Sequence, residues 1–351
     1  MGCAAGIRYE RDRATGRRTM RVIQLLLSDR IGGAETLADS LHSDFRGCGW
    51  DATVAYLDPT GVKGSPRKRL SSLRAQVAAT KPDAVLSHSA LPNLYARLAW
   101  PGPVVTVLHS ATDDFASAQL RVAERLLQRR TAAIVAVSPE AAAVYMRRFG
   151  RTPLVIPNGV RAQFLPGDRD VVGPLRIVCS ARLSAQKDPA TWFQIAARVT
   201  AAVDAEFAWY GPDEGGMSNC ERPDDETWRH SFKGPTDAPW DVVRSASIYL
   251  HTATREAHPI ALLEAAAAGV PIVCTQDVAE TLPVGLAATT FRSGDVDDGV
   301  NAIRRCIETL PALREVAMIA SERVRSEFSM QDCAARYTAC LNAAVMARSE
   351  R

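Results

Sequence analysis

The stretch SIYLHTATREAHPIALLEAAAAGVPIVCT, residues 247–275, decides the fold class. Short apolar runs at 247–253 and 271–275 flank a segment rich in alanine and leucine, 259–269, which begins with a proline. Proline is favoured in the first turn of a helix, and uninterrupted apolar runs are typical of strands buried on both faces of a parallel sheet. The stretch therefore predicts a strand, a helix and a second strand, which is the repeating unit of a parallel α/β sheet.

The same alternation continues outward through both halves of the chain. In the first half we expect strands at 21–28, 51–57, 83–89, 103–110 and 132–138, and helices at 34–49, 73–80, 93–100 and 118–130. In the second half we expect further strands at 176–182 and 205–211, a helix at 189–201, and closing helices at 296–310, 311–328 and 330–348. The pattern predicts an α/β fold with two doubly wound parallel sheets.

The 351 residues indicate two domains, each large enough for a core of its own. A stretch rich in proline and glycine, 153–173, is the expected linker between them. We place an N-terminal domain at 20–165 and a C-terminal domain at 170–336, with a last helix at 337–351 packing back on the first. Residues 1–19, which are rich in arginine and lack an apolar core, are expected to be a disordered tail.

The composition of the chain argues against several classes of protein. The chain is 47% hydrophobic and 23% charged, with no run near the roughly 18 apolar residues of a membrane-spanning helix. Its net charge of +3 argues against a nucleic-acid partner. The eight cysteines show no C-x-x-C spacing and no metal-like pairing with the histidines. A reducing, cytoplasmic location is expected.

Two carboxylates give the most specific signal for a binding site. Glu256 precedes the helix that Pro259 begins, and Glu264 lies within that helix. Glu256 would accept hydrogen bonds from sugar hydroxyls, Glu264 would bind a ribose diol, and the helix start between them would hold a diphosphate. The alternative is a pair of solvated glutamates around a core helix.

Three weaker signals also follow strands. Arg182 and Lys187 can neutralise a diphosphate without a metal, or they can be a solvated basic loop. Gly32 and Gly33 allow a close approach to a phosphate, or form a tight turn that needs positive φ. His109 ends a strand at the edge of the expected cleft, although a lone histidine is more often structural.

A D-x-D pair, Asp295 and Asp297, resembles a metal motif. Its setting, a turn followed by a helix, favours helix capping instead, so no metal is predicted.

Taken together, these motifs resemble the retaining glycosyltransferase family 4, which has the GT-B fold. The resemblance spans nearly the whole chain from Met20. It is carried by GGAE at 32–35, VLHS at 107–110, VIPNGV at 155–160, SARLSAQKD at 180–188, FKG at 232–234 and EAHPIALLEAAAAGVPIV at 256–273. The resemblance implies two Rossmann-like domains that face each other across a cleft.

It also implies transfer of a sugar from a nucleotide-sugar donor with retention at the anomeric carbon. By resemblance, Arg182 and Lys187 hold the donor diphosphate, Glu256 contacts the sugar and Glu264 the ribose. Gly32 and Gly33 approach the phosphates, and His109 takes the place of the active-site histidine. The catalytic set is then His109, Arg182, Lys187 and Glu256, and the further donor-binding residues are Gly211, Lys233, Gly234, His258, Pro259 and Ile260.

The chain departs from the family pattern at two places. Ala257-His258 stands where the family usually has Gly-Phe, and the glycine-rich segment is reduced to 211–214. We expect a UDP-sugar rather than a GDP-sugar as cosubstrate, no other cofactor, and a glycan, lipid-linked or small-molecule acceptor in polysaccharide or glycolipid biosynthesis. The alternatives are a GT-B sugar-nucleotide 2-epimerase and an inactive GT-B partner subunit.

A basic segment at 63–77 suggests a membrane contact. Leu70, Leu73 and Val77 share one helical face beside a cluster of lysines and arginines, as in helices that lie on anionic lipid. The alternative is that this face belongs to the core and the cations are solvated.

Overall fold

The structure is a computed structural model that describes residues 19–30, 32–59, 63–110, 114–166, 174–214, 227, 230–283, 286 and 289–350. The tail expected at 1–19 lies outside the described residues, apart from Thr19. The chain divides into two compact units, Met1–Gly159 with Met330–Arg351, and Val160–Ser329. The sequence placed these boundaries at 165 and 336. The first boundary differs because the fully buried ring of Phe164 packs into the core of the second unit. The second differs because one helix, Met330–Ser349, belongs to the first unit over its whole length.

The first unit contains a parallel sheet of six strands among its described residues. Its strands are β1 (Arg21–Leu26), β2 (Asp51–Tyr56), β3 (Ala84–His88), β4 (Val104–Leu108), β5 (Ala133–Ala136) and β6 (Leu154–Val155). They run in the order β2-β1-β3-β4-β5-β6, with each neighbouring pair parallel. Strand β6 lies inside the stretch that the sequence suggested as a linker.

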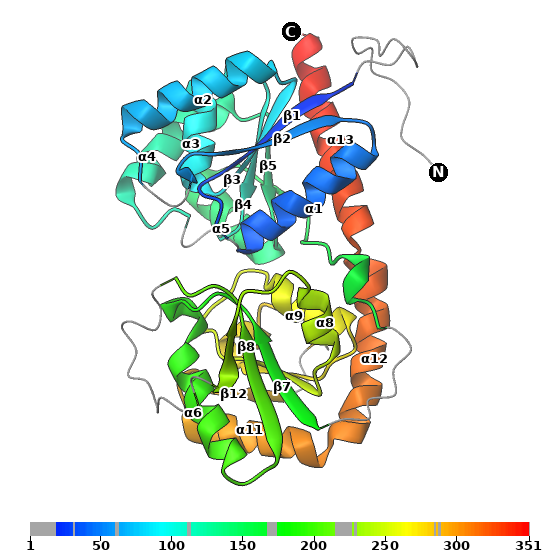
Figure 1. Cartoon of the computed structure of the whole chain (residues 1–351). Helices are drawn as coiled ribbons and strands as arrows, with labels where there is room; N and C mark the ends of the chain where they lie inside the picture. Colours follow the sequence, from blue (N-terminus) through cyan, green and yellow to red (C-terminus); the bar gives the residue numbers. More distant parts are fainter. Residues whose placement is uncertain are drawn as a thin grey trace. The chain divides into compact units, whose positions relative to one another are not determined.

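Helices cover both faces of this sheet (Figure 1). They are α1 (Gly33–Gly47), α2 (Pro66–Thr80), α3 (Ala90–Ala99), α4 (Ala118–Leu127), α5 (Pro139–Phe149) and α13 (Met330–Ser349). On one face, α13 contacts α1, β3 and β4. On the other, α2 and α3 pack together against β1, and α3 also contacts β3 and β4. The last helix of the chain thus completes the first unit.

The second unit has its own six described strands, also in one parallel sheet. They are β7 (Leu175–Ser180), β8 (Ala205–Tyr210), β9 (Phe232–Gly234), β10 (Ile248–His251), β11 (Ile272–Thr275) and β12 (Thr289–Phe291). Their order is β12-β11-β10-β7-β8-β9. Numbered along the chain, this is the 3-2-1-4-5-6 order of the dinucleotide-binding Rossmann fold.

Two helical layers sandwich this sheet (Figure 1). The helices are α6 (Pro189–Thr200), α8 (Pro239–Arg244), α9 (Ile260–Ala267), α10 (Gln276–Ala279), α11 (Val296–Glu308) and α12 (Leu310–Glu327). Helices α6 and α11 pack together on one face around Trp192, Phe193 and Trp209, while α8, α9 and α12 cover the other. Both faces of the strands are therefore buried, as their uninterrupted apolar runs predicted.

Helix starts follow the capping chemistry of the sequence. Ser138 caps α5 and Asp188 caps α6, each with a proline at the next position. Asp295 caps α11 by accepting a hydrogen bond from the Asp298 backbone N–H at 2.9 Å. The setting proposed for the D-x-D pair is thus confirmed for Asp295.

The apolar face of α2 belongs to the core of the first unit. Leu73 and Val77 are buried there with Ile23 and Val85, and Leu70 packs against the same cluster. This apolar face is therefore closed to a lipid surface, which corrects the suggestion of an amphipathic membrane helix at 63–77. Arg67 and Lys68 remain exposed on α2, whereas Arg69 forms an ion pair with Asp58.

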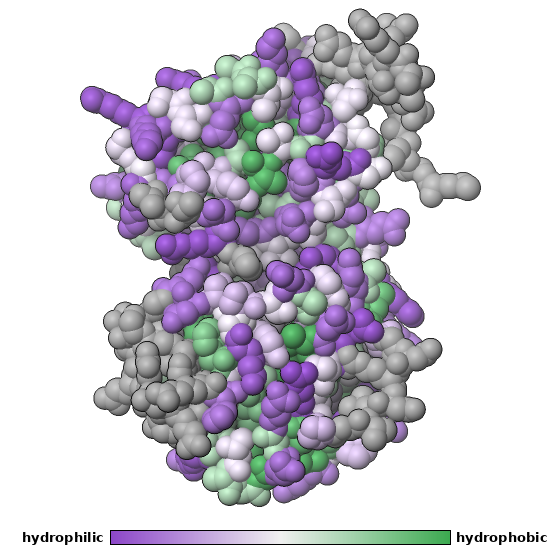
Figure 2. Space-filling view, in the orientation of Figure 1, coloured by the Kyte–Doolittle hydropathy of each residue, from purple (hydrophilic) through white to green (hydrophobic). Residues whose placement is uncertain are grey.

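Hydrophilic side chains predominate over the visible face of each unit, with small apolar areas between them (Figure 2). Among the described residues, no helix combines the length and the hydrophobicity that crossing a bilayer requires.

Candidate functional site

The strand order of the second unit locates its binding edge. In an open parallel sheet, ligands bind at the carboxyl ends of the strands where the chain order reverses. Here that point lies between β7 and β10, which are neighbours in the sheet although β8 and β9 come between them in sequence. Arg182 and Lys187 follow β7, and Glu256 follows β10. Three of the residues singled out in the sequence therefore flank the reversal point.

At this point Lys187 and Glu256 form a direct ion pair. The Lys187 ammonium donates to Oε1 of Glu256, and the two side chains are only 15% and 11% exposed. His251, the last residue of β10, places its Nε2 3.2 Å from the same carboxylate oxygen. The cation, the carboxylate and the imidazole form one polar cluster, which we call the Lys187 cluster.

Electrostatics keep the carboxylate of this cluster ionised. Burial would raise the pKa of Glu256, but Lys187 and the hydrogen bond from His251 outweigh it and lower the pKa to about 2. Burial also lowers the pKa of His251, against the opposing pull of Glu256. At neutral pH the cluster therefore contains one cation, one anion and a neutral imidazole.

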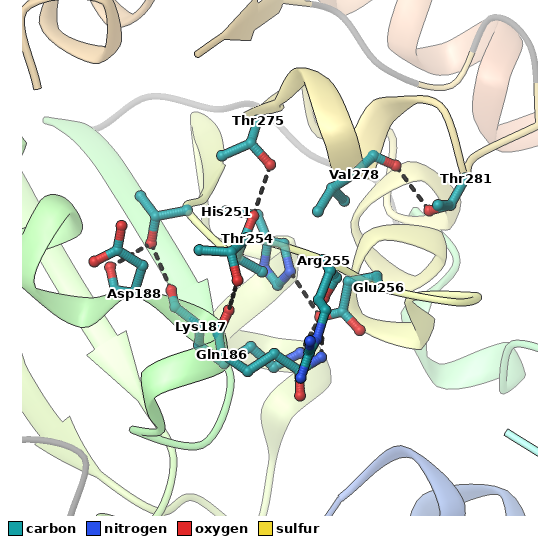
Figure 3. A network of polar contacts seen from close by, with 12 residues as sticks. Gln186, Lys187, Asp188, His251, Thr254, Arg255, Glu256, Thr275, Val278 and Thr281 are labelled. Carbon is teal, nitrogen blue, oxygen red and sulfur yellow. Dashed lines mark hydrogen bonds and ion pairs between the residues drawn. The ribbon is translucent and has the colours of Figure 1, made fainter. Parts of the chain in front are cut away.

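Loop-to-loop hydrogen bonds hold the cluster in place (Figure 3). Thr252 donates its hydroxyl to the carbonyls of Lys187 and Asp188 at 2.8 and 2.9 Å. The Gln186 amide donates to the Arg255 carbonyl at 2.9 Å, and the Thr254 backbone N–H donates back to the Gln186 carbonyl at 2.9 Å. The short 3-10 helix Ala185–Lys187 and the loop after β10 are thus tied together, which fixes both ends of the ion pair.

Arg182 lies in a more open position. Its guanidinium donates to Oε2 of Glu214 at 3.0 Å, and its side chain is 34% exposed. Gly211, the first residue after β8, has a φ of +146°, and a Cβ there would lie 2.0 Å from the Ala181 carbonyl oxygen. Only glycine fits this close approach of the loops after β7 and β8.

The other donor-binding candidates of the second unit lie along the same edge. The Gly211 backbone N–H donates to the Gly234 carbonyl at 2.9 Å, and Lys233 is exposed. Pro259 is the N-cap of α9, with no side-chain hydrogen bond to the helix start. Ile260 is buried, and the His258 ring packs against Phe328, with burial lowering its pKa to about 4.

Glu264 is more buried than its proposed role suggests. Glu264 is 8% exposed, and burial raises the pKa of its carboxyl to about 8, although the charge of Arg161 opposes this shift. Arg161 lies over the rings of Phe164 and Trp240, at 5.5 and 5.6 Å from their centroids. The ligand-free protein therefore holds Glu264 largely protonated at neutral pH.

The remaining candidates belong to the first unit. Gly32 is the N-cap of α1 with an extended backbone, φ −162°, so the alternative of a turn with positive φ at this residue is wrong. Gly33 is exposed as the first residue of the same helix. His109 follows β4 and contacts His88 at the end of β3, with Nδ1 of His88 3.1 Å from Nε2 of His109.

Metal ligands are not gathered in the part of the chain that the structure describes, since no group of three or more His, Cys, Asp or Glu side chains meets there. Asp297 forms an ion pair with Arg198, and Asp295 with Arg292.

Sequence reasoning missed four residues of these clusters: His251, Glu214, Arg161 and His88. His251 and His88 each end an apolar strand, so position in the strand was an available signal. Glu214 and Arg161 lie in loops whose folding depends on distant segments, and nothing in their local sequence indicates their partners.

Comparison with known proteins gives two matches in tandem. Residues 31–164 match the family model Glycosyltransferase Family 4, and residues 174–309 match Glycosyl transferases group 1. No curated protein sequence matches the chain.

Solved structures match over almost the whole chain. HepE of Anabaena, in complex with UDP-glucose, has a TM-score of 0.77 at 17% identity, covering 92% of this chain and 100% of its own. Sucrose-phosphate synthase from Thermosynechococcus elongatus has a TM-score of 0.73 at 15% identity, covering 93% and 100%. A glycosyltransferase from Rickettsia africae has a TM-score of 0.70 at 11% identity, covering 93% and 99%. The predicted fold class, with two Rossmann-like sheets, is thereby confirmed.

Proposed function

This chain belongs to the GT-B glycosyltransferases, since the two family matches follow one another along it, and on that premise we propose that it is a retaining enzyme of family 4. It would move a sugar from a nucleotide-sugar donor to a glycan, a lipid-linked or a small-molecule acceptor. The C1–O bond to the donor diphosphate breaks, and a new C1–O bond to the acceptor forms on the same face of the sugar.

The observation that carries this proposal is the position of the Lys187 cluster at the reversal point of the second sheet. Bond breaking leaves negative charge on the departing diphosphate, and fixed cations at that place lower the barrier. Lys187 and Arg182 are the cations at this edge that the proposal assigns to the diphosphate. The uncapped start of α9 adds backbone N–H groups.

In this proposal Glu256 contacts the donor sugar and Glu264 the ribose. Both carboxylates lie at or near the carboxyl edge of β10, on the loop and on helix α9. Diphosphate binding would draw Lys187 toward the phosphates and release Glu256 to accept hydrogen bonds from sugar hydroxyls. In the ligand-free protein, the ion pair keeps both charges satisfied meanwhile.

A UDP-sugar is the donor we propose, without a metal ion. HepE, which shares the fold, is described in complex with UDP and with UDP-glucose, and this supports UDP as the nucleotide. Two cations and a helix start can together offset the charge of a diphosphate, which is the role that a divalent cation has in other transferases.

A donor screen tests the proposal. UDP-glucose, UDP-galactose, UDP-N-acetylglucosamine and GDP-mannose are incubated with the protein in excess EDTA, and nucleotide release is measured. We expect release from one UDP-sugar, loss of release in Lys187→Met, and no change in Arg304→Ala, an exposed cation on α11 of the same unit. The anomeric configuration of the product, read by NMR, tests retention.

Three other outcomes of this experiment would each contradict a different part of the proposal. Conversion of a UDP-sugar to its 2-epimer without an acceptor would identify an epimerase. Binding without turnover would identify an inactive partner subunit. Activity that disappears in EDTA and returns with Mg²⁺ or Mn²⁺ would contradict metal independence.

A further inference from the structure

Two histidines form a stacked pair at the carboxyl edge of the first unit's sheet. His88 ends β3 and is 1% exposed, whereas His109, just after β4, is half-buried. Their rings are stacked at 5.3 Å between centroids with 23° between planes, and Nδ1 of His88 lies 3.1 Å from Nε2 of His109. The two facing nitrogens are therefore hydrogen-bonded.

Both rings are neutral at physiological pH. Burial, with a smaller contribution from His109, lowers the pKa of His88 well below 6.5, and burial lowers the pKa of His109 to about 4. A neutral imidazole has one N–H and one bare nitrogen. One facing nitrogen must then donate while the other accepts, so the tautomers of the two rings are linked.

The far nitrogen of His88 distinguishes the two arrangements. Among the residues that the structure describes, Nε2 of His88 is buried and has no hydrogen-bond partner. If His109 donated, this nitrogen of His88 would bear a buried N–H with no acceptor, and such orphaned donors are rare in native proteins. If His88 donates from Nδ1, its Nε2 is bare, and His109 must hold its proton on Nδ1.

We propose that His88 is a positioning residue that holds His109 in the Nδ1–H tautomer, so that His109 presents a neutral hydrogen-bond donor to a hydroxyl oxygen of the sugar substrate. The tautomer assignment rests on the pair alone, and only its use with a sugar rests on the proposed function. A donor of this kind binds an oxygen without adding charge to its surroundings.

The backbone around the pair supports a fixed geometry. Asp114 accepts hydrogen bonds from the backbone N–H groups of Ala90 at 3.2 Å and Ser110 at 3.1 Å, which ties the loop after β3 to the loop after β4. Ser89, between His88 and Ala90, has φ +67° and ψ 163°. This conformation is almost restricted to glycine and persists only where the surroundings impose it, which is typical of functional sites.

The direct test is the tautomer of His109 in the ligand-free protein. Selective ¹⁵N labelling of histidine distinguishes protonated from bare ring nitrogens by NMR, and loss of signals in His109→Gln assigns the residue. We expect protonation at Nδ1. Protonation at Nε2, or a mixture of both forms, would overturn the proposal, and this measurement needs no variant of His88 to fold.

Substitutions at position 88 test the cause. His88→Phe keeps a ring but removes the donor, so His109 should move toward the Nε2–H form that imidazole prefers in water. His88→Asn places an amide N–H near the position of Nδ1 and should keep the wild-type tautomer. His230→Asn, at an exposed histidine of the second unit, is the matched control and should change nothing. An unchanged tautomer in His88→Phe would show that His88 does not set it.

Sugar transfer supplies the second readout. We expect His88→Phe to lower kcat/KM by about tenfold, as for loss of one aligned hydrogen bond, and His88→Asn to stay within about twofold of wild type. If the tautomer shifts while transfer is unaffected, the role of His109 as donor to the sugar is wrong. If no nucleotide-sugar is turned over by the wild type, the proposed function fails while the tautomer result stands by itself.

Discussion

Lys187 and Arg182 carry the same charge in different surroundings. Substituting them should therefore have similar effects on kcat but different effects on the free energy of unfolding. Both Lys187→Met and Arg182→Ala should lower kcat by about a hundredfold, because each removes a preorganised cation from the leaving group. Lys187→Met should also lower the free energy of unfolding by about 3 kcal/mol, since it leaves the buried Glu256 carboxylate without a cation. Arg182→Ala should cost less than about 1 kcal/mol, because its pair with Glu214 is partly exposed.

Urea unfolding and steady-state kinetics measure the two effects. In the double variant with Glu256→Gln, the stability lost in Lys187→Met should return in part, because the unpaired charge is removed. Near-normal turnover in both single variants would contradict the assignment of these cations to the diphosphate.

The raised pKa of Glu264 predicts that the free energy of unfolding changes with pH in one direction. Its pKa is raised from 4.5 to about 8 in the folded protein, so between these values the native state binds a proton that the unfolded state has lost. The free energy of unfolding therefore falls as the pH rises through this window, and it levels off above it. Glu264→Gln removes this dependence.

Thermal or urea unfolding at a series of pH values tests this prediction. The variant should match the wild type near pH 4 and gain stability over it progressively toward about pH 9. Because the comparison is between two proteins, other groups with shifted pKa values, such as Asp114, cancel. Parallel curves across the whole range would show that Glu264 is ionised in the folded protein.

Strand β8 and the loop after it depend on Gly211. In Gly211→Ala the new Cβ would meet the Ala181 carbonyl oxygen, and the backbone has a φ that L residues rarely adopt. We expect a loss of more than about 2 kcal/mol in unfolding free energy. Gly150→Ala, at the end of α5, is the control, because its φ of +73° is also unfavourable but its Cβ would meet no atom of the described residues within 4 Å. That variant should lose about 1 kcal/mol. Equal losses would mean that the loops after β7 and β8 can separate.

Helix α2 can contact a membrane only through its exposed charged side chains, because its apolar face is buried in the core of the first unit. We expect any binding of the protein to anionic vesicles through this helix to weaken with salt and to fall in the variant Arg67→Ser/Lys68→Ser. Leu70→Ala should alter stability rather than binding, because Leu70 packs against the core. Sedimentation with neutral and anionic vesicles provides the measurement. Equal partition into both would exclude an electrostatic contact.

The sequence predicted the central strands because their apolar runs are uninterrupted. The expected strand at 103–110 contains β4, and that at 176–182 contains most of β7. Short edge strands were missed, as at β6 (Leu154–Val155) and β12 (Thr289–Phe291), because so few residues carry no periodicity. Helix α2 begins at Pro66, ahead of the predicted start at 73, because Ser65 caps it and its first turn is polar.

The site was predictable in part for a similar reason. Arg182, Lys187 and Glu256 follow strands directly, so their edge of the sheet could be derived from order alone. The pairing of Lys187 with Glu256 and His251 joins residues far apart in sequence and required the fold. The burial of Glu264 also depends on tertiary packing, in the core where α9 packs with α8 and α12.

At the scale of the whole molecule, the two units differ in the number of chain segments that form them. The second is one segment, Val160–Ser329, whereas the first needs both Met1–Gly159 and Met330–Arg351. We expect a fragment of residues 160–329 to unfold cooperatively on its own. A fragment of 20–159 should not, because without α13 it exposes the sheet face that Tyr337 and Leu341 help to bury. Circular dichroism melts of the two fragments test this, and a cooperative transition in the second would contradict it.

Helix α13 also sets an unusual order of events during translation. Domains usually complete themselves in the order in which they leave the ribosome. In this protein the earlier unit waits for the last helix, while the unit translated after it is already finished. We therefore expect the apolar face over β3 and β4 to stay uncovered until α13 is synthesised, and a chaperone would bind the nascent chain on this surface.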